Sequence, residues 1–277
     1  MTADEAAGQV RYALSPGPIL TPWELSLTEP WLRHTAPTCC TRVLEESNAN
    51  GFCGFVHPFL WPLPRGRFMA ATPTREEIDE EKAALRARGR DRRAEIHARD
   101  GAEAARAMRD RFLARVPLAA GAVVAGYWPF GSEMDPMPLL EALHKRGHGL
   151  ALPVVERRGA PLIFRRWKPG DEMSAHRFGM SEPLATRPRV DPDIIVAPLL
   201  CFDARGNRLG YGGGFYDRTL IVQRKIKPTL AVGVAFAAQR VERIPTDIHD
   251  QKLDWIVTET EALRAKTDAK RNWWWPW

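Results

Sequence analysis

Cysteine and long apolar runs are scarce in this sequence. There are four cysteines in 277 residues, and none forms a pair spaced for metal binding with a nearby histidine. This favours a reduced, cytoplasmic protein. No apolar run reaches the ~18 residues of a membrane span, and the first residues, Met1 to Glu5, lack the basic start of a secretory signal. We therefore expect no membrane partner.

Two common phosphate-binding patterns are also absent from the glycine-rich segment, Gly206 to Arg218. No Gly-Lys-Ser or Gly-Lys-Thr follows its glycines, so it is not a Walker A loop, and its glycine spacing is not that of a dinucleotide-binding loop. Four of the five positions from 210 to 214 are nevertheless glycine. The simplest alternative is a tight turn that contains glycine for backbone reasons alone.

The neighbours of this glycine loop favour a phosphate site. An apolar run at 193–200 is typical of a buried strand, and residues 216–225 are predicted to form a helix. Between a strand and a helix, a glycine loop brings backbone N–H groups close to phosphate, and the helix N-terminus adds partial positive charge. Arg208 and Arg218 flank the loop, and Asp217 offers an oxygen to a hard cation such as Mg²⁺.

Length and composition set the limits of the interpretation. The chain is long enough for one large or two small domains, and 44% apolar residues suffice for a sizeable core. The net charge of +6 suits anionic ligands such as nucleotides or polyglutamates. This charge is too diffuse to indicate nucleic-acid binding.

The two ends of the chain differ from its middle. In residues 1–75 prolines and tryptophans are scattered and no period persists, so we interpret this part as an irregular N-terminal extension. Either the arm packs on the surface, or translation starts later, with Met69 as the true start; the sequence leaves both open. The basic, tryptophan-rich tail at 263–277 is expected to be disordered, with a membrane-surface or partner contact as the alternative.

Residues 76–262 have the alternating pattern of an α/β domain. Thr74 and Glu77 form a capping-box pattern that opens a long basic helix, whose arginines we interpret mostly as a solvated face. Further helices are predicted from about 100 to 115, at 136–146 and at 216–225, and strands at 121–128, 149–155, 162–167, 193–200, 229–236 and 255–258. This order predicts a mostly parallel sheet with helices on both faces.

The ends of the predicted strands collect the polar residues of interest. In sheets of this kind, ligands bind beyond the carboxyl ends of the strands. Glu133, the glycine loop and Asp250 each follow a predicted strand. One crevice is therefore expected to bring them together.

Five short motifs occur in the order found in one known family. They are Lys82-Ala83-Ala84-Leu85-Arg86, Glu133 after the first strand, the turn Gly179-x-x-Glu182-Pro183, the glycine loop, and His249-Asp250. With these motifs, residues 78–260 resemble the 5-formyltetrahydrofolate cyclo-ligases, also called 5,10-methenyltetrahydrofolate synthetases. The resemblance implies an α/β three-layer sandwich, Rossmann-like as in the NagB/RpiA/CoA-transferase-like superfamily.

The resemblance also implies an activity. Such enzymes close 5-formyltetrahydrofolate to 5,10-methenyltetrahydrofolate with ATP and Mg²⁺, giving ADP and phosphate. Transfer of the γ-phosphoryl group to the formyl oxygen creates an iminium phosphate, and N10 of the folate then closes the ring as phosphate departs. This chemistry asks the protein chiefly for positioning and charge neutralisation.

The site residues follow from the same resemblance. The implied ATP contacts are Lys82, Ala83, Ala84, Leu85, Arg86, Arg208, Leu209, Gly210, Tyr211, Gly212, Gly213, Gly214, Phe215 and Tyr216. The implied folate contacts are Arg86, Trp128, Glu133, Phe215 and Tyr216. Glu133 and Arg208 are the expected catalytic residues, and Asp217 and Asp250 the expected Mg²⁺ ligands.

This chain departs from the family pattern at two positions of the glycine loop. Tyr211 stands where many members carry a basic residue, and Gly213 where some carry lysine. Backbone amides therefore take a larger share of the expected phosphate contacts.

Two other functions stay open on the sequence. One is a catalytically silent paralogue that binds nucleotide, folate or RNA as a regulatory module; the basic helix supports it, because phosphate neutralisation needs no fixed site. The other is an ATP-dependent ligase for a different formylated or carboxylated cofactor. For the leading hypothesis the partner is a reduced formyl-folate, with or without a polyglutamate tail, and the protein is expected to be a monomer or weak dimer without nucleic acid.

Overall fold

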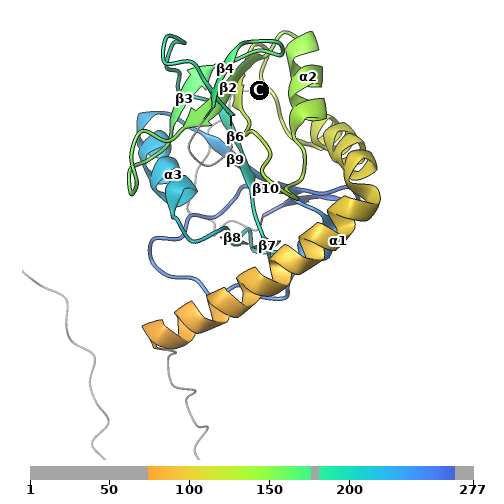
Figure 1. Ribbon diagram of the computed structural model, residues 1–277, viewed down its shortest axis with the longest axis vertical. Helices are drawn as coiled ribbons and strands as arrows, with labels where there is room; N and C mark the ends of the chain where they lie inside the picture. Colours follow the sequence, from red (N-terminus) through yellow and green to blue (C-terminus); the bar gives the residue numbers. More distant parts are fainter. Residues whose placement is uncertain (1–73, 176–180, 266–277) are drawn as a thin grey trace, which may run out of the picture. The chain divides into compact units, whose positions relative to one another are not determined.

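The computed structural model describes residues 74–175 and 181–265, coloured in Figure 1. Outside these residues lie positions 1–73 of the arm expected at 1–75, Gly179 and Met180 of the expected turn, and positions 266–277 of the tail expected at 263–277. The main elements are α1 (Arg75–Arg115), β1 (Val123–Ala125), α2 (Met137–Lys145), β2 (Gly149–Val154), β3 (Ile163–Arg166), β6 (Ile194–Pro198), α3 (Phe215–Ile226), β9 (Leu230–Val234), β10 (Trp255–Val257) and β11 (Ala262–Arg264).

A seven-stranded sheet forms the centre of the described chain, with the order β11-β10-β9-β6-β1-β2-β3. The pairs β1–β2, β1–β6, β6–β9 and β9–β10 are parallel, whereas the two edge strands, β3 and β11, pair antiparallel. The predicted α/β class with a mostly parallel sheet is thus confirmed. The edge strand β11 crosses the domain boundary expected at residue 262.

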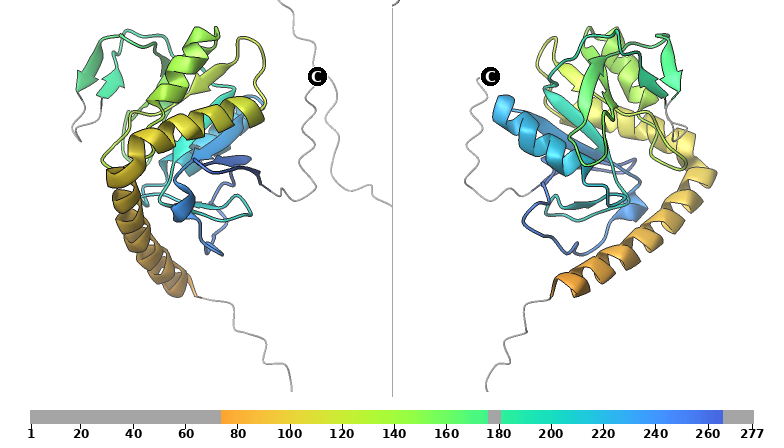
Figure 2. Two further views of the ribbon diagram at one scale, coloured as in Figure 1. Left: turned by 90° about the vertical axis from the view of Figure 1, so that its right-hand side faces the viewer. Right: turned by 60° about the vertical axis from the view of Figure 1, so that its left-hand side comes forward.

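The two faces of the sheet carry side chains of different size. Val196 and Val232 point to the face that α1 and α2 cover, where they pack with Phe112 and Leu140. On the other face, Ala125, Ala151, Ala197 and Ala231 pack with Leu220 of α3. Neighbouring residues of one strand alternate between the faces, and Figure 2 shows the helices on both sides. The predicted three layers are confirmed.

One continuous helix, α1, replaces the two predicted helices. Thr74 caps it with the expected capping box to Glu77, and it continues through Asp100 and Gly101 for 41 residues. A glycine costs only about 1 kcal/mol inside a helix, and no proline stands between 75 and 115 to stop it. Figure 2 shows that α1 changes direction along its length. No described helix is both long and apolar enough to cross a membrane.

Two small hairpins were expected to be loops. β4 (Met173–Ala175) pairs with β5 (Ser181–Pro183), so the expected Glu-Pro turn is partly a strand. β7 (Cys201–Phe202) pairs with β8 (Arg208–Leu209), so the first part of the glycine-rich segment is also extended. Pairs this short lie below the length at which alternation is readable in a sequence, since strands usually span about 5–6 residues.

Candidate active site

The glycine loop lies between β8 and α3, as predicted. Gly212 and Gly214 have φ angles of 96° and 63°, which L side chains rarely adopt. Within the described residues, the N–H groups of Gly212, Gly213 and Gly214 donate no hydrogen bond. These donors stand at the N-terminus of α3, where the helix dipole also favours an anion.

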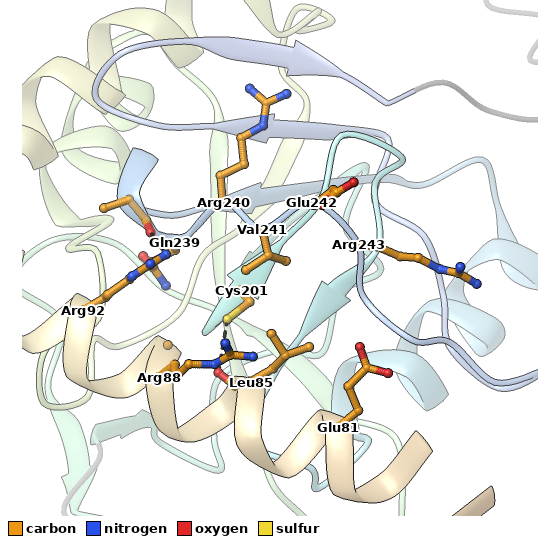
Figure 3. A pocket seen from close by; sticks show the side chains of 12 residues that line it. Glu81, Leu85, Arg88, Arg92, Cys201, Gln239, Arg240, Val241, Glu242 and Arg243 are labelled. Atoms are coloured by element: carbon orange, nitrogen blue, oxygen red, sulfur yellow. Dashed lines mark hydrogen bonds between the residues drawn. The ribbon is translucent and has the colours of Figure 1, made fainter. Parts of the chain in front are cut away.

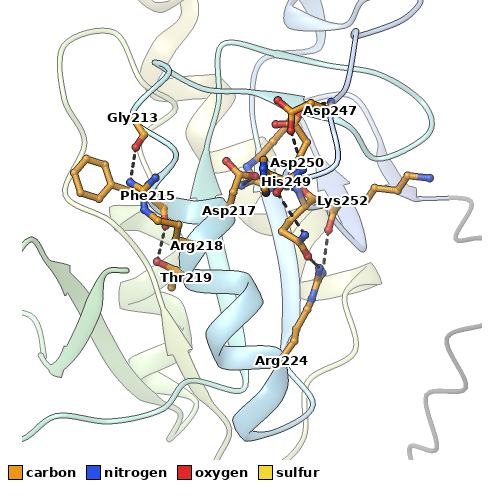
Figure 4. Close-up of polar contacts among 12 residues, drawn as sticks. Gly213, Phe215, Asp217, Arg218, Thr219, Arg224, Asp247, His249, Asp250 and Lys252 are labelled. Atoms are coloured by element: carbon orange, nitrogen blue, oxygen red, sulfur yellow. Dashed lines mark hydrogen bonds and ion pairs between the residues drawn. The ribbon is translucent and has the colours of Figure 1, made fainter. Parts of the chain in front are cut away.

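Two arginines brace this loop. Arg86 Nε of α1 donates to the carbonyl oxygen of Gly210 at 3.1 Å. Arg218 Nη2 donates to the carbonyl oxygen of Gly213 at 2.5 Å, and its guanidinium lies 5.4 Å from the centre of the Phe215 ring (Figure 4). Both carbonyls are thereby turned toward cations, which leaves the opposite side of these peptides, with its N–H groups, open to a ligand.

Lys82 of α1 reaches the closing turn and pairs there with two aspartates. Its Nζ lies 2.7 Å from Asp250 Oδ2 and 3.2 Å from Asp247 Oδ2, and only 7% of the side chain is exposed. Burial works to lower the pKa of Lys82, but the two carboxylates outweigh it and raise the pKa. Burial likewise works to raise the pKa of Asp247, yet the His249 N–H and Lys82 bring it below its ordinary range.

Arg208 joins α3 to the same turn. Its Nη2 donates to Asp217 Oδ1 at 2.8 Å and its Nη1 to the Gln251 carbonyl oxygen at 2.6 Å. The Gln251 N–H donates to Asp217 Oδ1 at 3.0 Å. Burial lowers the pKa of the Arg208 guanidinium, an effect that the Asp217 charge opposes. Figure 4 shows Asp217 beside Asp247 and Asp250, so the structure brings both predicted metal ligands together.

The two predicted metal ligands each keep an unused oxygen. Asp217 is contacted through Oδ1 and Asp250 through Oδ2, so the other oxygen of each has no hydrogen-bond partner among the described residues. No group of three or more His, Cys, Asp or Glu that could hold a metal ion occurs in the described ranges. Two carboxylates suit Mg²⁺ that takes its remaining ligands from water and phosphate.

Glu133 follows β1, as expected, but it is not a solvated loop carboxylate. The residue is 5% exposed, and its Oε2 accepts the N–H of Phe130 at 3.0 Å. Burial raises the pKa of Glu133, while the Phe130 N–H and the Arg93 charge only partly oppose this. Burial raises the pKa of Tyr216, and the Glu133 charge raises it further, so these two side chains share one buried environment.

Arg93 is the residue of this site that the sequence interpretation missed. It belongs to the arginine run interpreted mostly as a solvated face, yet it is 4% exposed. Its Nε donates to Ser132 Oγ at 3.1 Å, its Nη2 to the Tyr211 hydroxyl at 2.5 Å, and its Nη1 lies 3.7 Å from Glu133 Oε1. A signal was available, because Lys82, Arg86 and Arg93 share one helical face.

The other side chains expected to contact ligands differ in their exposure. Trp128 packs partly buried against the α1-side core, and Tyr216 against the α3-side core. Ala83 and Ala84 are exposed on α1, whereas Leu85 and Leu209 are buried together in a small core with Cys201. The side chains of those two leucines therefore serve packing. Glu182 accepts the N–H of Val155 at 3.0 Å, which ties β5 to the end of β2.

A separate surface pocket of about 490 Å³ lies along another stripe of α1. It is lined by residues of α1 and of 238–243, with Cys201 at its base, and no residue of the glycine loop, Glu133 or the aspartates lines it. In Figure 3, Arg240 and Arg243 point away from Cys201. The pocket is therefore not part of the candidate site.

The fold and the site together define a class of protein. It is a three-layer α/β protein with an open anion-binding loop, two carboxylates able to hold a hard cation, and a buried carboxyl group at the same edge of the sheet. Such a site suits phosphoryl-transfer chemistry on a second, organic substrate.

The comparisons with known proteins identify the family. Residues 78–259 match the 5-formyltetrahydrofolate cyclo-ligase family, and the chain belongs to it. It is 36% identical over 157 residues to the 5-formyltetrahydrofolate cyclo-ligase of Escherichia coli K12, covering 55% of this chain and 86% of that protein. The corresponding enzyme of Mycolicibacterium smegmatis is 32% identical over 153 residues, which cover 52% of this chain and 77% of that protein.

Solved structures agree with this assignment. The NMR structure of Aquifex aeolicus 5,10-methenyltetrahydrofolate synthetase superposes with a TM-score of 0.57 at 30% identity, covering 68% of this chain and 94% of that one. A synthetase from Mycoplasma pneumoniae, at 20% identity and a TM-score of 0.52 over 64% of this chain and 98% of that one, supports the fold. The predicted family membership is confirmed, and the chain is a ligase.

Proposed function

We infer that this protein converts 5-formyltetrahydrofolate to 5,10-methenyltetrahydrofolate, with ATP converted to ADP and phosphate. One observation supports this inference: a single face of α1 contacts the glycine loop through Arg86, Asp250 of the closing turn through Lys82, and the buried Glu133 through Arg93. A chain that belongs to the cyclo-ligase family needs these three features for a nucleotide, a cation and a folate.

The glycine loop would hold the phosphates of ATP. Gly212, Gly213 and Gly214 offer N–H groups that no described residue uses. Arg86 stands beside Gly212, where an added Cβ would lie 3.5 Å from its guanidinium, so its charge is next to the loop. Lys82 places a second cation at the closing turn. Arg208 has two of its groups in structural bonds, so we assign it mainly to holding Asp217.

Asp217 Oδ2 and Asp250 Oδ1 would hold Mg²⁺ with phosphate oxygens and water. An ion held there would supply positive charge against the charge that develops on the phosphates during transfer. The protein holds both carboxylates in place, because Arg208 and the Gln251 N–H contact one and Lys82 the other.

Glu133 would hydrogen-bond the folate ring or orient its formyl group. Tyr216 lies close enough to Glu133 to feel its charge, and the rings of Tyr216, Trp128 and Phe215 would offer flat apolar surface to a pterin. Arg86 is half-buried and contacts the glycine loop at Gly210, so it would meet phosphate or folate.

The residues of this site fit the two chemical steps. The formyl oxygen is a poor leaving group, so the γ-phosphoryl group is first transferred to it and ADP is formed. N10 then attacks the activated carbon, the C–O bond breaks, and phosphate leaves with that oxygen. The protein holds the two substrates in line and shields the reactive carbon from water. We further propose that it acts in the cytoplasm, as a monomer or weak dimer without nucleic acid.

An absorbance assay for methenyl-folate tests this function. Purified protein is given 5-formyltetrahydrofolate with ATP and Mg²⁺, without ATP, or without Mg²⁺. Product is expected only in the complete mixture. A folded protein that binds both ligands but forms no product would instead be the silent regulatory paralogue. A protein that hydrolyses ATP only with another formylated cofactor would be a ligase of different specificity.

A further inference from the structure

Arg93 connects the two parts of the site that the proposed function assigns to different ligands. Its guanidinium touches Ser132 on the Glu133 loop and Tyr211 on the glycine loop at the same time. These loops are 79 positions apart along the chain, from 132 to 211. Within the described residues, no other side chain contacts both loops through a hydrogen bond or ion pair.

The contacts of Arg93 are directional. Two nitrogens of the planar guanidinium donate hydrogen bonds, Nε to Ser132 and Nη2 to the Tyr211 hydroxyl, and the third, Nη1, faces Glu133. The carbon of the guanidinium also lies 5.4 Å from the centre of the Tyr211 ring. A rigid fork of this kind transmits displacement, because a shift of one partner rotates the plane that the others contact.

The third edge of the fork is incompletely paired. Nη1 is buried and has no hydrogen bond, since Glu133 Oε1 stands at 3.7 Å. Buried donors rarely remain without a partner. The distance to Glu133 exceeds the usual limit of an N–H···O hydrogen bond by only about 0.5 Å, so a small rotation of the guanidinium can complete the pair.

Tyr211 is placed to start such a movement. It is 50% exposed and belongs to the loop whose N–H groups face the phosphate position. The other end of the connection is fixed, because α1 packs closely on β7: a Cβ on Gly89 would stand 2.7 Å from Cys201 Sγ and from the Leu200 carbonyl oxygen. Movement of the glycine loop is therefore passed to the Arg93 side chain and not absorbed by the helix.

We propose that Arg93 is a positioning residue that couples nucleotide binding at the glycine loop to folate binding at Glu133. Nucleotide draws the loop and Tyr211 inward, Arg93 turns with the hydroxyl, and Glu133 is fixed in the orientation that accepts the folate. By linkage, folate must then strengthen nucleotide binding by the same factor. The proposal rests on the proposed function only for which ligand occupies which loop.

Calorimetric titration measures this coupling without turnover. ADP with Mg²⁺ is titrated into the protein, with and without saturating 5-formyltetrahydrofolate, and the reverse titration is run with ADP saturating. For the natural protein we expect each ligand to tighten the other by about fivefold or more. In Arg93→Met each ligand still binds alone, but the factor falls close to one.

Three further variants separate coupling from folding. Tyr211→Phe keeps the half-exposed ring and removes only the hydroxyl, so it should fold and show a reduced factor. Arg93→Lys keeps the charge beside Glu133 without the planar fork, so each ligand should still bind alone but the factor should not be restored. Arg90→Met, at an exposed arginine of the same helix, is the matched control and should behave as the natural protein.

The outcomes are decisive in each case. A factor of one in the natural protein, or an unchanged factor in both Arg93→Met and Tyr211→Phe, would overturn the coupling. If Arg93→Met does not fold, Tyr211→Phe alone decides. Coupling with no methenyl product would contradict the proposed reaction while leaving this connection intact, and product without coupling would do the reverse.

Discussion

The two halves of the site handle charge in opposite ways. In the aspartate half, formed by Lys82, Asp247, Asp250, Arg208 and Asp217, each carboxylate has a cation within 2.7 to 3.2 Å and its side chain is 26–45% exposed. In the Glu133 half, formed by Glu133, Arg93 and Tyr216, the nearest cation stands 3.7 Å from a carboxyl group that is 6% exposed. The carboxylates of the aspartate half are paired and partly exposed, whereas the carboxyl group of the Glu133 half is buried and has no cation within hydrogen-bond distance.

This difference matches the two kinds of ligand. Phosphates and Mg²⁺ bring large charges with hydration shells, and the partly exposed carboxylates of the aspartate half can exchange contacts for them at a lower desolvation cost than fully buried groups. A folate ring is largely flat and apolar, and a buried carboxyl group recognises it through a few directed hydrogen bonds. Four substitutions test this difference between the two halves, from the largest expected effect to the smallest.

The largest effect is expected at Lys82. Lys82→Met removes the cation that holds Asp247 and Asp250, so the two carboxylates repel each other and the nucleotide loses a charge partner. We expect kcat/KM for ATP to fall by about 10²-fold or more, with a smaller change for folate. Steady-state kinetics in both substrates measures this, with Lys82→Arg as the charge-conserving control. A fall of less than threefold would remove Lys82 from the nucleotide site.

Asp217→Asn should come next. Asparagine can still accept the Gln251 N–H, but it leaves the buried Arg208 without its counter-charge, so the free energy of unfolding should fall by about 1–3 kcal/mol. The Mg²⁺ concentration for half-maximal rate should also rise. Combined with Asp250→Asn, the loss should be less than additive if both hold one ion. An unchanged Mg²⁺ titration would leave Asp217 a purely structural role.

Glu133→Gln tests the Glu133 half through the pH dependence of protein stability. Burial raises the pKa of Glu133 above its unfolded value, so this group stabilises the fold below its unfolded pKa and loses that contribution as pH rises through the folded pKa. The melting temperature of Glu133→Gln, relative to the natural protein, should therefore increase from about pH 4 to pH 7. Thermal unfolding across that range measures it, and a relative decrease would show that the Arg93 pairing outweighs burial.

The smallest effect is expected for Asp247→Asn, with the opposite sign. The pKa of Asp247 is lowered, so its contribution is present above the unfolded pKa and is lost as pH falls through the folded pKa. The side chain is 45% exposed, so the loss at neutral pH should stay within a few tenths of a kcal/mol. The same unfolding series checks it, and a loss as large as that of Asp250→Asn would contradict the order of the two contacts to Lys82.

The layers of the fold and the polar residues that follow the strands could be predicted from the sequence. The apolar runs predicted β1, β2, β6 and β9, and the carboxyl-edge rule placed Glu133, the glycine loop and Asp250 on one side. These features are local or follow from chain direction, so no tertiary contact is needed to infer them.

The partners of side chains from segments distant in the chain could not be predicted from the sequence. Whether Asp217 meets a metal or Arg208 depends on how β8 and the closing turn meet α3. The role of Arg93 depends on which side of α1 faces the loops. Arginines stand on several sides of this helix, so the sequence does not reveal which of them is buried. The uninterrupted course of α1 through Gly101 depends on packing against the sheet, which outweighs the low helix propensity of glycine.

The two halves are expected to serve different substrates, and a crossed kinetic comparison separates them. Michaelis constants for ATP and for 5-formyltetrahydrofolate are measured in Asp250→Asn and in Glu133→Gln under the same conditions. Asp250→Asn should raise the constant for ATP more than the constant for folate, and Glu133→Gln should raise the constant for folate more than the constant for ATP. If both variants raised both constants to the same extent, or if the pattern were reversed, the division of the site would be contradicted.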